Sequence, residues 1–283
     1  MMKKFMALGL AVVLASAALT GCGNSAAKKT VKVIDVNLTD EEYAFGVDKT
    51  QPELLDSVNA FIKEIKDNGT FDEICNHYFG DGTPVAVTSA ALDDSKDQLL
   101  VATNAAFEPF EYMQGESYYG IDMEIAAALA QYLGKELVIQ NMDFDAVCLS
   151  VGQQKCDIAM AGLTVREDRK EYVNFSDSYY SASQKLIVLS DDTEFDSCKT
   201  ADDVAALLAA KDASVKVGVQ TGTTGQLYVE GDAEWGFPGL TAEGVGYKNG
   251  SLAVQDLLNG NIQYVIIDSA PAICITEAIN KMQ

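Results

Sequence analysis

Short apolar segments alternate with longer amphipathic segments along most of this 283-residue chain, and this alternation limits the folds open to it. The longer segments carry apolar residues at the three- and four-residue spacing of a helix, whereas the short segments are rich in Val, Ile and Leu. Strands separated by helices favour an α/β architecture with a mostly parallel sheet. The predicted strands cover residues 31–36, 99–103, 137–140, 158–161, 186–189, 215–219 and 264–267.

Helix starts are also marked in the sequence. Thr50 precedes Glu53 and Thr70 precedes Glu73 at the spacing of a capping box, which predicts a helix from each position. Other helices are predicted to begin at Asp, Thr or Ser and to end near Gly or Lys. They cover residues 122–134, 200–211, 251–260 and 271–281.

Residues 1–21 are predicted to form an export signal. Lys3 and Lys4 precede an apolar stretch over residues 5–18 that is too short to span a bilayer. The following Leu-Thr-Gly-Cys, ending at Cys22, resembles the lipobox of bacterial lipoproteins. We therefore expect lipidation at Cys22, a tether over residues 22–30, and a protein anchored by lipid alone at the outer face of the cytoplasmic membrane. A signal-anchor helix is the alternative.

Acidic residues dominate the charged composition. The chain has 42 Asp and Glu against 20 Lys and Arg, giving a net charge of −22 at pH 7, which disfavours nucleic acid or anionic lipid as a partner. Five cysteines follow Cys22, and most lie in apolar segments typical of buried thiols. His77 is the sole histidine, so the sequence predicts no Ser-His-Asp site, no metal site, no cofactor and no catalytic residue.

Residues 161–180 are the most informative run for function. They follow a buried-strand pattern and supply Thr164, Arg169 and the backbone at Gly162. Arg binds a carboxylate through two parallel hydrogen bonds, and hydroxyl and backbone N–H groups complete the shell of donors. The run therefore predicts a carboxylate site at the end of the strand. The alternative is a surface arginine.

A second anion site is predicted at residues 220–225, Gln-Thr-Gly-Thr-Thr-Gly, between a strand and a helix. A glycine-rich turn at a helix start presents free N–H groups and the positive end of the helix dipole. The turn lacks the lysine and the spacing of a nucleotide P-loop. Asp268 ends the strand at 264–267, and its spacing fits equally a helix cap and a ligand-binding acid.

These motifs resemble the family-3 solute-binding proteins of bacterial amino-acid ABC importers, in which small-x-Thr-x-x-x-x-Arg precedes Phe-Ser-x-x-Tyr-Tyr. The resemblance implies a periplasmic-binding-protein-like fold of two α/β lobes with a ligand cleft between them. It also implies a monomeric extracellular or periplasmic protein. Such a protein captures a polar L-amino acid by cleft closure and delivers it to an ABC permease and ATPase on other chains.

The resemblance assigns roles to the groups that hold the ends of the ligand. Gly162, Thr164 and Arg169 would bind the carboxylate from the first lobe. Thr224 would bind the same carboxylate from the second lobe, and Asp268 would bind the ammonium.

The resemblance also assigns the side-chain pocket. Phe107 and Phe144 would enclose the ligand's side chain, although simple core packing is the alternative for each. Asn104 and Gln220 would contact its distal end. Family members that bind lysine or arginine commonly carry an acid where this chain has Asn104, and an amide cannot neutralise a buried charge. A neutral polar ligand such as glutamine is therefore favoured.

A basic ligand stays open as the second choice. Glu108 and Glu111 lie close in sequence to the pocket residues and would supply the missing charge if they turned inward. Glu108 would also serve as the proton-transfer residue in an alternative function, that of the periplasmic cyclohexadienyl dehydratases, which share this fold. The sensor lobe of a receptor is a third class, but it would require a transmembrane helix or a signalling domain.

The order of the elements differs from that of the family. A segment like residues 104–112 opens the family's mature domain, and segments like 41–47 and 68–80 close it, but here the closing part comes first. Residues 81–97 are rich in small and polar residues and have no apolar period, which is typical of a linker. We therefore expect a circular permutant. The alternative is a helical pair appended to an incomplete domain.

In the permutant, the linker 81–97 joins the ancestral termini, and the strand at 31–36 lies beside the chain end at Gln283. The expected first lobe comprises residues 43–80 and 98–185. The expected second lobe comprises residues 31–42 and 186–283.

Overall fold

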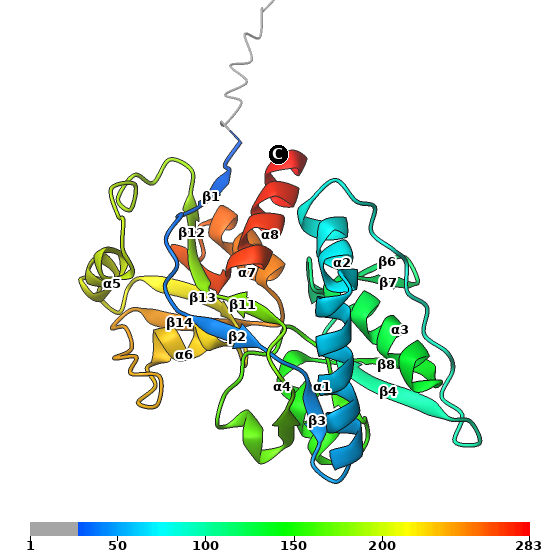
Figure 1. The fold of residues 1–283 in the computed structure, drawn as a ribbon. Coiled ribbons are helices and arrows are strands. Elements are labelled where there is room, and N and C mark those ends of the chain that lie inside the picture. The colour runs from blue at the N-terminus through cyan, green and yellow to red at the C-terminus, as the bar shows by residue number, and fades with distance from the viewer. Residues whose placement is uncertain (1–27) are drawn as a thin grey trace, which may run out of the picture.

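The computed structural model describes residues 28–283, so the predicted signal peptide and Cys22 lie outside the described residues. Two five-stranded sheets, each covered by helices, form two α/β lobes (Figure 1). This confirms the predicted fold class. We call the lobe around the sheet β10-β3-β9-β4-β8 lobe one, and the lobe around β1-β12-β15-β13-β14 lobe two.

Lobe one contains a mixed sheet rather than a mostly parallel one. Strand β4 is parallel to its neighbours β8 and β9, whereas β3 is antiparallel to β9 and β10. The strands are β3 (Gly46–Asp48), β4 (Gln98–Thr103), β8 (Glu136–Asn141), β9 (Ile158–Ala159) and β10 (Val173–Phe175). The helices are α1 (Pro52–Asp67), α2 (Thr70–Phe79), α3 (Ile121–Leu133) and α4 (Phe144–Gly152).

Lobe two is also mixed. Strands β13, β14 and β15 are parallel, and β12 joins β15 and β1 by antiparallel pairing. The strands are β1 (Val31–Val33), β12 (Gln184–Leu189), β13 (Lys216–Gln220), β14 (Glu243–Tyr247) and β15 (Tyr264–Asp268). The helices are α5 (Ala201–Ala209), α6 (Thr224–Glu230), α7 (Gly250–Asn259) and α8 (Ser269–Met282).

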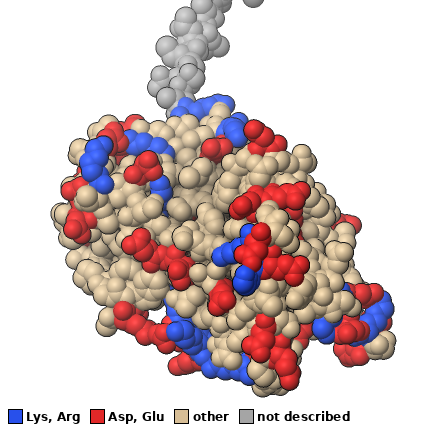
Figure 2. Space-filling model, in the orientation of Figure 1, with Lys and Arg blue, Asp and Glu red and all other residues tan. Residues whose placement is uncertain are grey.

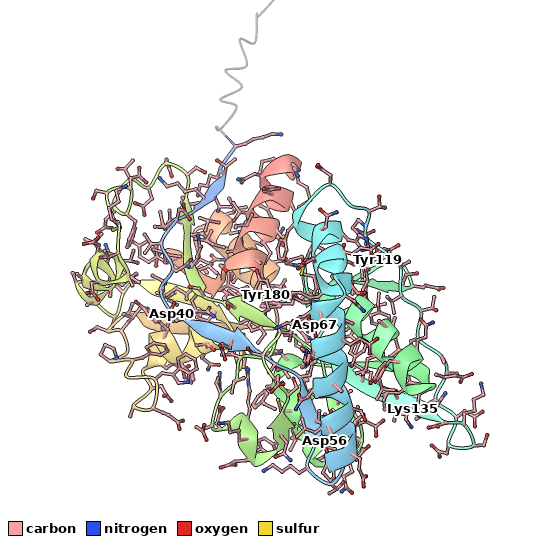
Figure 3. All side chains as sticks on the ribbon, viewed as in Figure 1. Asp40, Asp56, Asp67, Tyr119, Lys135 and Tyr180 are labelled. Atoms are coloured by element: carbon pink, nitrogen blue, oxygen red, sulfur yellow. The ribbon has the colours of Figure 1, made fainter. Side chains whose placement is uncertain are left out.

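Two antiparallel strands, β2 (Glu41–Tyr43) and β11 (Tyr180–Ala182), carry the chain between the lobes. Figure 3 shows Asp40 and Tyr180 at this crossing, between the helices of lobe one and the sheet of lobe two. Both Glu41 and Tyr43 are buried, while Glu42 between them is exposed. The ribbon therefore directs alternate side chains inward.

A small sheet of three strands lies beside lobe one. It comprises β5 (Ala106–Phe107), β6 (Glu111–Gln114) and β7 (Ser117–Tyr119). Its β5–β6 pairing sets Phe107 directly opposite Glu111. Opposed residues in an antiparallel pair share one face, so these two side chains lie on the same side of the hairpin.

The first and last described segments lie together at the top of lobe two in Figure 1. The Asn280 side chain in α8 accepts a hydrogen bond from the Val31 N–H at 3.0 Å and donates one to the Val31 carbonyl at 2.8 Å. This is the arrangement that a permutation requires, because β1 completes a sheet whose other strands come from the distant half of the chain.

Several predicted element boundaries were wrong. The strand predicted over 31–36 ends at Val33, although the Ile34 N–H still bonds to Leu186. Neither predicted capping box at Thr50 or Thr70 forms: α1 begins after Gln51 and α2 after Gly69, without a side-chain cap. Each threonine instead bonds to a residue two positions before it. The Thr50 hydroxyl donates to the Asp48 carboxyl, and the Thr70 N–H donates to the Asn68 side-chain oxygen.

The remaining helix signals gave mixed results. The capping box at Thr200 forms with Asp203, and Gly260 ends α7 in the left-handed conformation, as predicted. The cap of α7 is Asn249 rather than Ser251. Asp122, predicted as a cap, instead lies in the first turn of α3 and is fully buried. Its carboxyl accepts hydrogen bonds from the Gly162 N–H and the Tyr179 hydroxyl.

Residues 81–97 contain no helix or extended strand, as expected of a linker. The segment packs along lobe one: Val87 is buried and forms an isolated bridge with Tyr118, and the Ala90 N–H bonds to the Leu137 carbonyl. It therefore runs from the end of α2 to the start of β4 across the surface of one lobe.

Acidic side chains outnumber basic ones over the face drawn in Figure 2. Among residues 28–283, no helix is both long and apolar enough to cross a membrane. The five described cysteines are free thiols, and Cys148, Cys156 and Cys198 are buried.

We propose that the chain is circularly permuted, with the lobe boundaries predicted above except that Gln184 and Lys185 belong to β12 of lobe two. The contact between α8 and β1, the path of residues 81–97 and the antiparallel joining of β1 to β12 support this proposal.

Restoring the ancestral order should preserve the fold. The reordered chain runs from Gln98 to Gln283, then through a linker of about four residues, then from Thr30 to Gly82. Its unfolding temperature should lie within a few degrees of that of the natural chain, because Asn280 and Val31 are hydrogen-bonded and a short loop can therefore connect the two ends. Thermal unfolding by circular dichroism measures this. Residues 98–283 alone are the control, and they should not fold, because β1 and β3 are missing. An insoluble reordered chain would contradict the permutation.

Candidate functional site

Arg169 lies at the end of lobe one that faces lobe two. It opens a short 3₁₀ turn after β9, is 7% exposed, and its Nη1 donates to the Thr164 carbonyl at 2.7 Å. Its Nη2 crosses to lobe two and donates to the Gly222 carbonyl at 3.0 Å. Burial, and then the neighbouring Arg166, lower the pKa of Arg169. Within residues 28–283 no carboxylate forms an ion pair with it.

Arg166 reinforces the same contact between the lobes and was missed by the sequence analysis. Its Nη1 donates to the Gly222 carbonyl at 3.2 Å, while Nε and Nη2 bind Asp168. The run at 161–180 held the signal, because it contains two arginines three residues apart. Only one of them was given a role.

Asp268 lies at the end of β15 in lobe two. It makes no side-chain cap to α8, which argues against the helix-cap alternative. Its Oδ1 accepts from the Tyr43 hydroxyl at 2.5 Å, and it is 4% exposed. Burial, together with the nearby charge of Glu41, raises the pKa of Asp268 to about 7. A cation beside this carboxyl would favour its charged form.

Glu41 was also missed by the sequence analysis. It is 4% exposed and joins the lobes: Oε1 accepts from Thr39 at 2.6 Å and from Gln184 at 2.9 Å, and Oε2 accepts from Thr164 at 2.6 Å. The signal was the alternation of residues 41–43, which sets Glu41 and Tyr43 on one face of a strand. That strand was not predicted, because it is only three residues long.

Gly162 is engaged within lobe one. Its N–H donates to Asp122 at 2.9 Å, and the Tyr179 hydroxyl donates to the same carboxyl at 2.6 Å. A side chain at residue 162 would collide with Phe107, and the φ of +54° is also that of a glycine. The predicted donation from the Gly162 N–H to a ligand carboxylate is therefore not available in this form, because Asp122 accepts it.

Asn104 and Gln220 meet across the lobes, as their shared assignment required. Gln220 Nε2 donates to Asn104 Oδ1 at 3.2 Å, and Asn104 Nδ2 donates to the Met142 carbonyl at 2.7 Å. Gln220 Oε1 is buried without a hydrogen-bond donor among the described residues, and so is Thr224 Oγ1. The pair therefore offers an unsatisfied acceptor.

The two aromatic residues contact different groups. Phe144 carries the Arg169 guanidinium over its ring at 5.2 Å from the centroid, and it lies within reach of Gly222. Phe107 is buried against Gly162 and packs on Phe110 at 6.2 Å between ring centroids. Phe107 thus contributes to the core of lobe one, next to Gly162.

Glu108 and Glu111 take different directions. Glu111 is fully buried, and neither of its carboxyl oxygens has a partner in the described structure. Burial, with Asp122 and Asp268 nearby, holds the pKa of Glu111 well above its usual range. Glu108 instead lines a separate hollow of about 350 Å³ between β5–β6 and helices α7 and α8.

Several of the assigned polar residues are thus buried near the junction of the lobes, where the hydrogen bonds of Arg169 to Gly222 and of Gln220 to Asn104 cross from one lobe to the other. They include a buried guanidinium from lobe one, a buried carboxyl from lobe two, and the unpartnered oxygens of Gln220 and Thr224. A molecule that carries both a carboxylate and an ammonium would satisfy the two charges.

Comparison with known proteins agrees with this arrangement. Residues 99–265, more than half of the chain, match the model of "Bacterial extracellular solute-binding proteins, family 3". The chain is 33% identical over 109 residues to the arginine-binding extracellular protein ArtP of Bacillus subtilis, covering 38% of this chain and 43% of that one. It is 28% identical over 171 residues to a probable histidine-binding protein of Neisseria gonorrhoeae, covering 60% and 58%.

Solved structures give the same picture. An ancestral arginine-binding protein bound to glutamine superposes with a TM-score of 0.53 at 32% identity, covering 65% of this chain and 74% of that one. Holo arginine-binding protein from T. maritima gives a TM-score of 0.54 at 33% identity, covering 67% and 78%. An ancestral amino acid-binding protein, a precursor of cyclohexadienyl dehydratase, gives 0.55 at 30%, covering 65% and 75%.

The match to the curated relatives is partial, since the chain spans 43% and 58% of their length in the two cases above. The matched family segment starts at the first strand after the linker and leaves out residues 28–98. The specific residues of the run at 161–180 lie inside it. The chain belongs to family 3 of the bacterial extracellular solute-binding proteins.

Proposed function

We propose that the protein is the substrate-binding component of an ABC importer and that it captures a polar L-amino acid by closure of its two lobes. The observation that carries this proposal is the pair formed by Arg169 and Asp268. They are buried, opposite in charge, contributed by different lobes, and without an ion-pair partner among the described residues. An isolated buried charge is costly, so both are expected to meet the charges of a ligand.

The ligand's ends are assigned from this pair. The carboxylate binds the donors of Arg169 that remain after its bonds to Thr164 and Gly222, together with Thr224. The ammonium binds Asp268. Contacts from both lobes exist together only when the lobes are closed, so the ligand shifts the equilibrium between open and closed forms by that difference in affinity.

The side chain of the ligand is assigned to the region of Asn104 and Gln220, between Phe107 and Phe144. Both pocket amides are neutral, and the bare Gln220 Oε1 requires an N–H donor. A neutral polar side chain such as that of glutamine meets this requirement without an unpaired charge. Arginine is the second choice. The names of the relatives, arginine-binding and histidine-binding, and the ancestral arginine-binding protein bound to glutamine make both worth testing.

The dehydratase alternative is not favoured. The residue suggested for proton transfer, Glu108, lines the separate hollow beside α8, where its charged neighbour is Lys281. The relatives named above are binding proteins, although one neighbour is a precursor of such an enzyme.

The cellular setting is part of the proposal. We infer a monomer held at the outer face of the cytoplasmic membrane by a lipid on Cys22, extracellular or periplasmic, that docks on a permease and its ATPase subunits. The family of extracellular solute-binding proteins supports the compartment. The lipid anchor rests on the lipobox resemblance in the sequence.

The first expected outcome concerns the ligand itself. A thermal-shift screen of the twenty amino acids, followed by competition among glutamine, arginine, histidine and cystine, should raise the unfolding temperature most with glutamine. Arginine winning by tenfold or more would overturn the neutral assignment. No shift with any amino acid would overturn the proposed function.

Removal of either charge should weaken binding strongly. Arg169→Ala and Asp268→Ala should each cost about 2–5 kcal/mol of affinity, because the opposing charge of the bound ligand stays buried and unpaired. Calorimetry measures the loss, and thermal melts check that both variants fold. Lys248→Ala is the matched control: its bond to Asp143 also joins the lobes, but both groups are exposed, so affinity should change little. Unchanged affinity in either charge variant rejects that residue's role.

Affinity should also depend on pH. Asp268 binds the ammonium only when ionised, and its pKa is raised to about 7 in the ligand-free protein. Affinity should therefore fall as the pH drops below 7, approaching tenfold per unit. Asp268→Asn keeps an acceptor for the Tyr43 hydroxyl and should bind weakly without that slope. A slope that persists in Asp268→Asn would point instead to Asp122, whose pKa is also raised to about 7.

A further inference from the structure

Glu41 receives hydrogen bonds from both lobes at the centre of the interlobe ribbon. The Thr39 hydroxyl and the Gln184 side-chain amide donate to Oε1, and the Thr164 hydroxyl donates to Oε2 at 2.6 Å. Thr39 in turn accepts the Gln184 N–H at 2.8 Å, which directs its own proton toward Glu41. Every neighbour bonded to this carboxylate therefore acts as a donor.

The consequence for Thr164 follows from counting protons. A hydroxyl carries one proton and two lone pairs, and a carboxylate accepts only. Because Glu41 takes the single proton of Thr164, the hydroxyl keeps only lone pairs for any further partner. The Thr164 carbonyl is already occupied by Arg169.

Thr164 is linked to Asp268 through two residues of β2: its hydroxyl bonds to Glu41, whose charge acts on Asp268, and its backbone pairs with Tyr43. Thr164 forms a backbone bridge with Tyr43, whose hydroxyl binds Asp268 at 2.5 Å. Glu41 and Tyr43 lie on the same buried face of β2. An acceptor hydroxyl beside a buried carboxyl suits an ammonium group, which has three donors and no acceptor.

We propose that Glu41 is a positioning residue of the ligand site, which fixes the Thr164 hydroxyl as an acceptor for the ligand's ammonium. This inference rests on the proposed amino-acid function. It changes the role expected for the Thr164 side chain, from the carboxylate of the ligand to its ammonium. Glu41 itself acts through Thr164 and need not touch the ligand.

The experiment compares ligands that differ only in the ammonium. Calorimetry with the full chain uses L-glutamine against 5-amino-5-oxopentanoate and L-arginine against 5-guanidinopentanoate, each pair lacking the amino group in its second member. The ratio of the two affinities reports on ammonium recognition. A purely structural role of Glu41 would weaken both members of a pair alike and leave the ratio unchanged.

Glu41→Gln should reduce that ratio by about tenfold or more. Its amide oxygen would accept from Thr39 and Gln184, so its NH₂ group would donate to Thr164 and turn the Thr164 proton toward the ammonium. Thr164→Val should reduce the ratio similarly, and the double variant should show no further loss, because the two residues act on the same contact. Thr164→Ser should keep the wild-type ratio.

Thr39→Val is the matched control. It removes another donor to Glu41 that does not bond to Thr164, so it should lower the unfolding temperature and leave the ratio within about twofold. Losses that multiply in the double variant, or an unchanged ratio in Glu41→Gln, would overturn the proposal.

The Thr164 variants decide the matter if Glu41→Gln does not fold. Equal weakening of both members of a pair by Thr164→Val would show that the hydroxyl serves the carboxylate, and the proposal would fall. If the thermal-shift screen identifies another amino acid as the ligand, that amino acid and its deamino analogue replace these pairs, and a wild type that binds no amino acid would overturn the proposed function as well. Binding by the wild type with an unmoved ratio in the variants overturns the role of Glu41 alone.

Discussion

Burial of an arginine and an aspartate without an ion-pair partner among the described residues is the constraint on which this structure depends. Arg169 and Asp268 are both nearly inaccessible, and in the described chain only neutral groups bond to them directly. Removing such charges from water is expensive. The apolar cores of the two lobes offset that expense, since β-branched and aromatic side chains fill both sheets. The site is thus maintained by well-packed surroundings at a cost in desolvation, which a ligand of complementary charge would reduce.

The ribbon of β2 and β11 joins the candidate site to the connection between the lobes. The strand that carries the chain between the lobes also carries Glu41 and Tyr43, which bind Thr164 of lobe one and Asp268 of lobe two. A rotation at the ribbon would therefore alter the surroundings of the charged groups. In the proposed mechanism, recognition and closure share the same few residues, so neither has to be transmitted over a distance.

The sequence predicted the parts of this design that have local signatures. The α/β class followed from the alternation of elements, whereas the two lobes followed from the family resemblance, to which the spacing of Thr164 and Arg169 led. The roles of Glu41 and Asp122 could not be predicted, because Thr164 and Gly162, which bind them, lie 123 and 40 residues away and meet them only in the folded chain. The capping box predicted at Thr50 was wrong for a different reason, because the Thr50 hydroxyl bonds to the nearby Asp48 instead of capping α1. The ligand contacts themselves stay predictions.

The element order has a consequence for how the chain folds as it is synthesised. All five strands of the lobe-one sheet lie between residues 46 and 175, so that sheet can close before β12 emerges. Strand β1 must instead wait for β12, about 150 residues later in the chain. The sheet of lobe one can therefore form first. Strand β1 stays unpaired until β12 has been made.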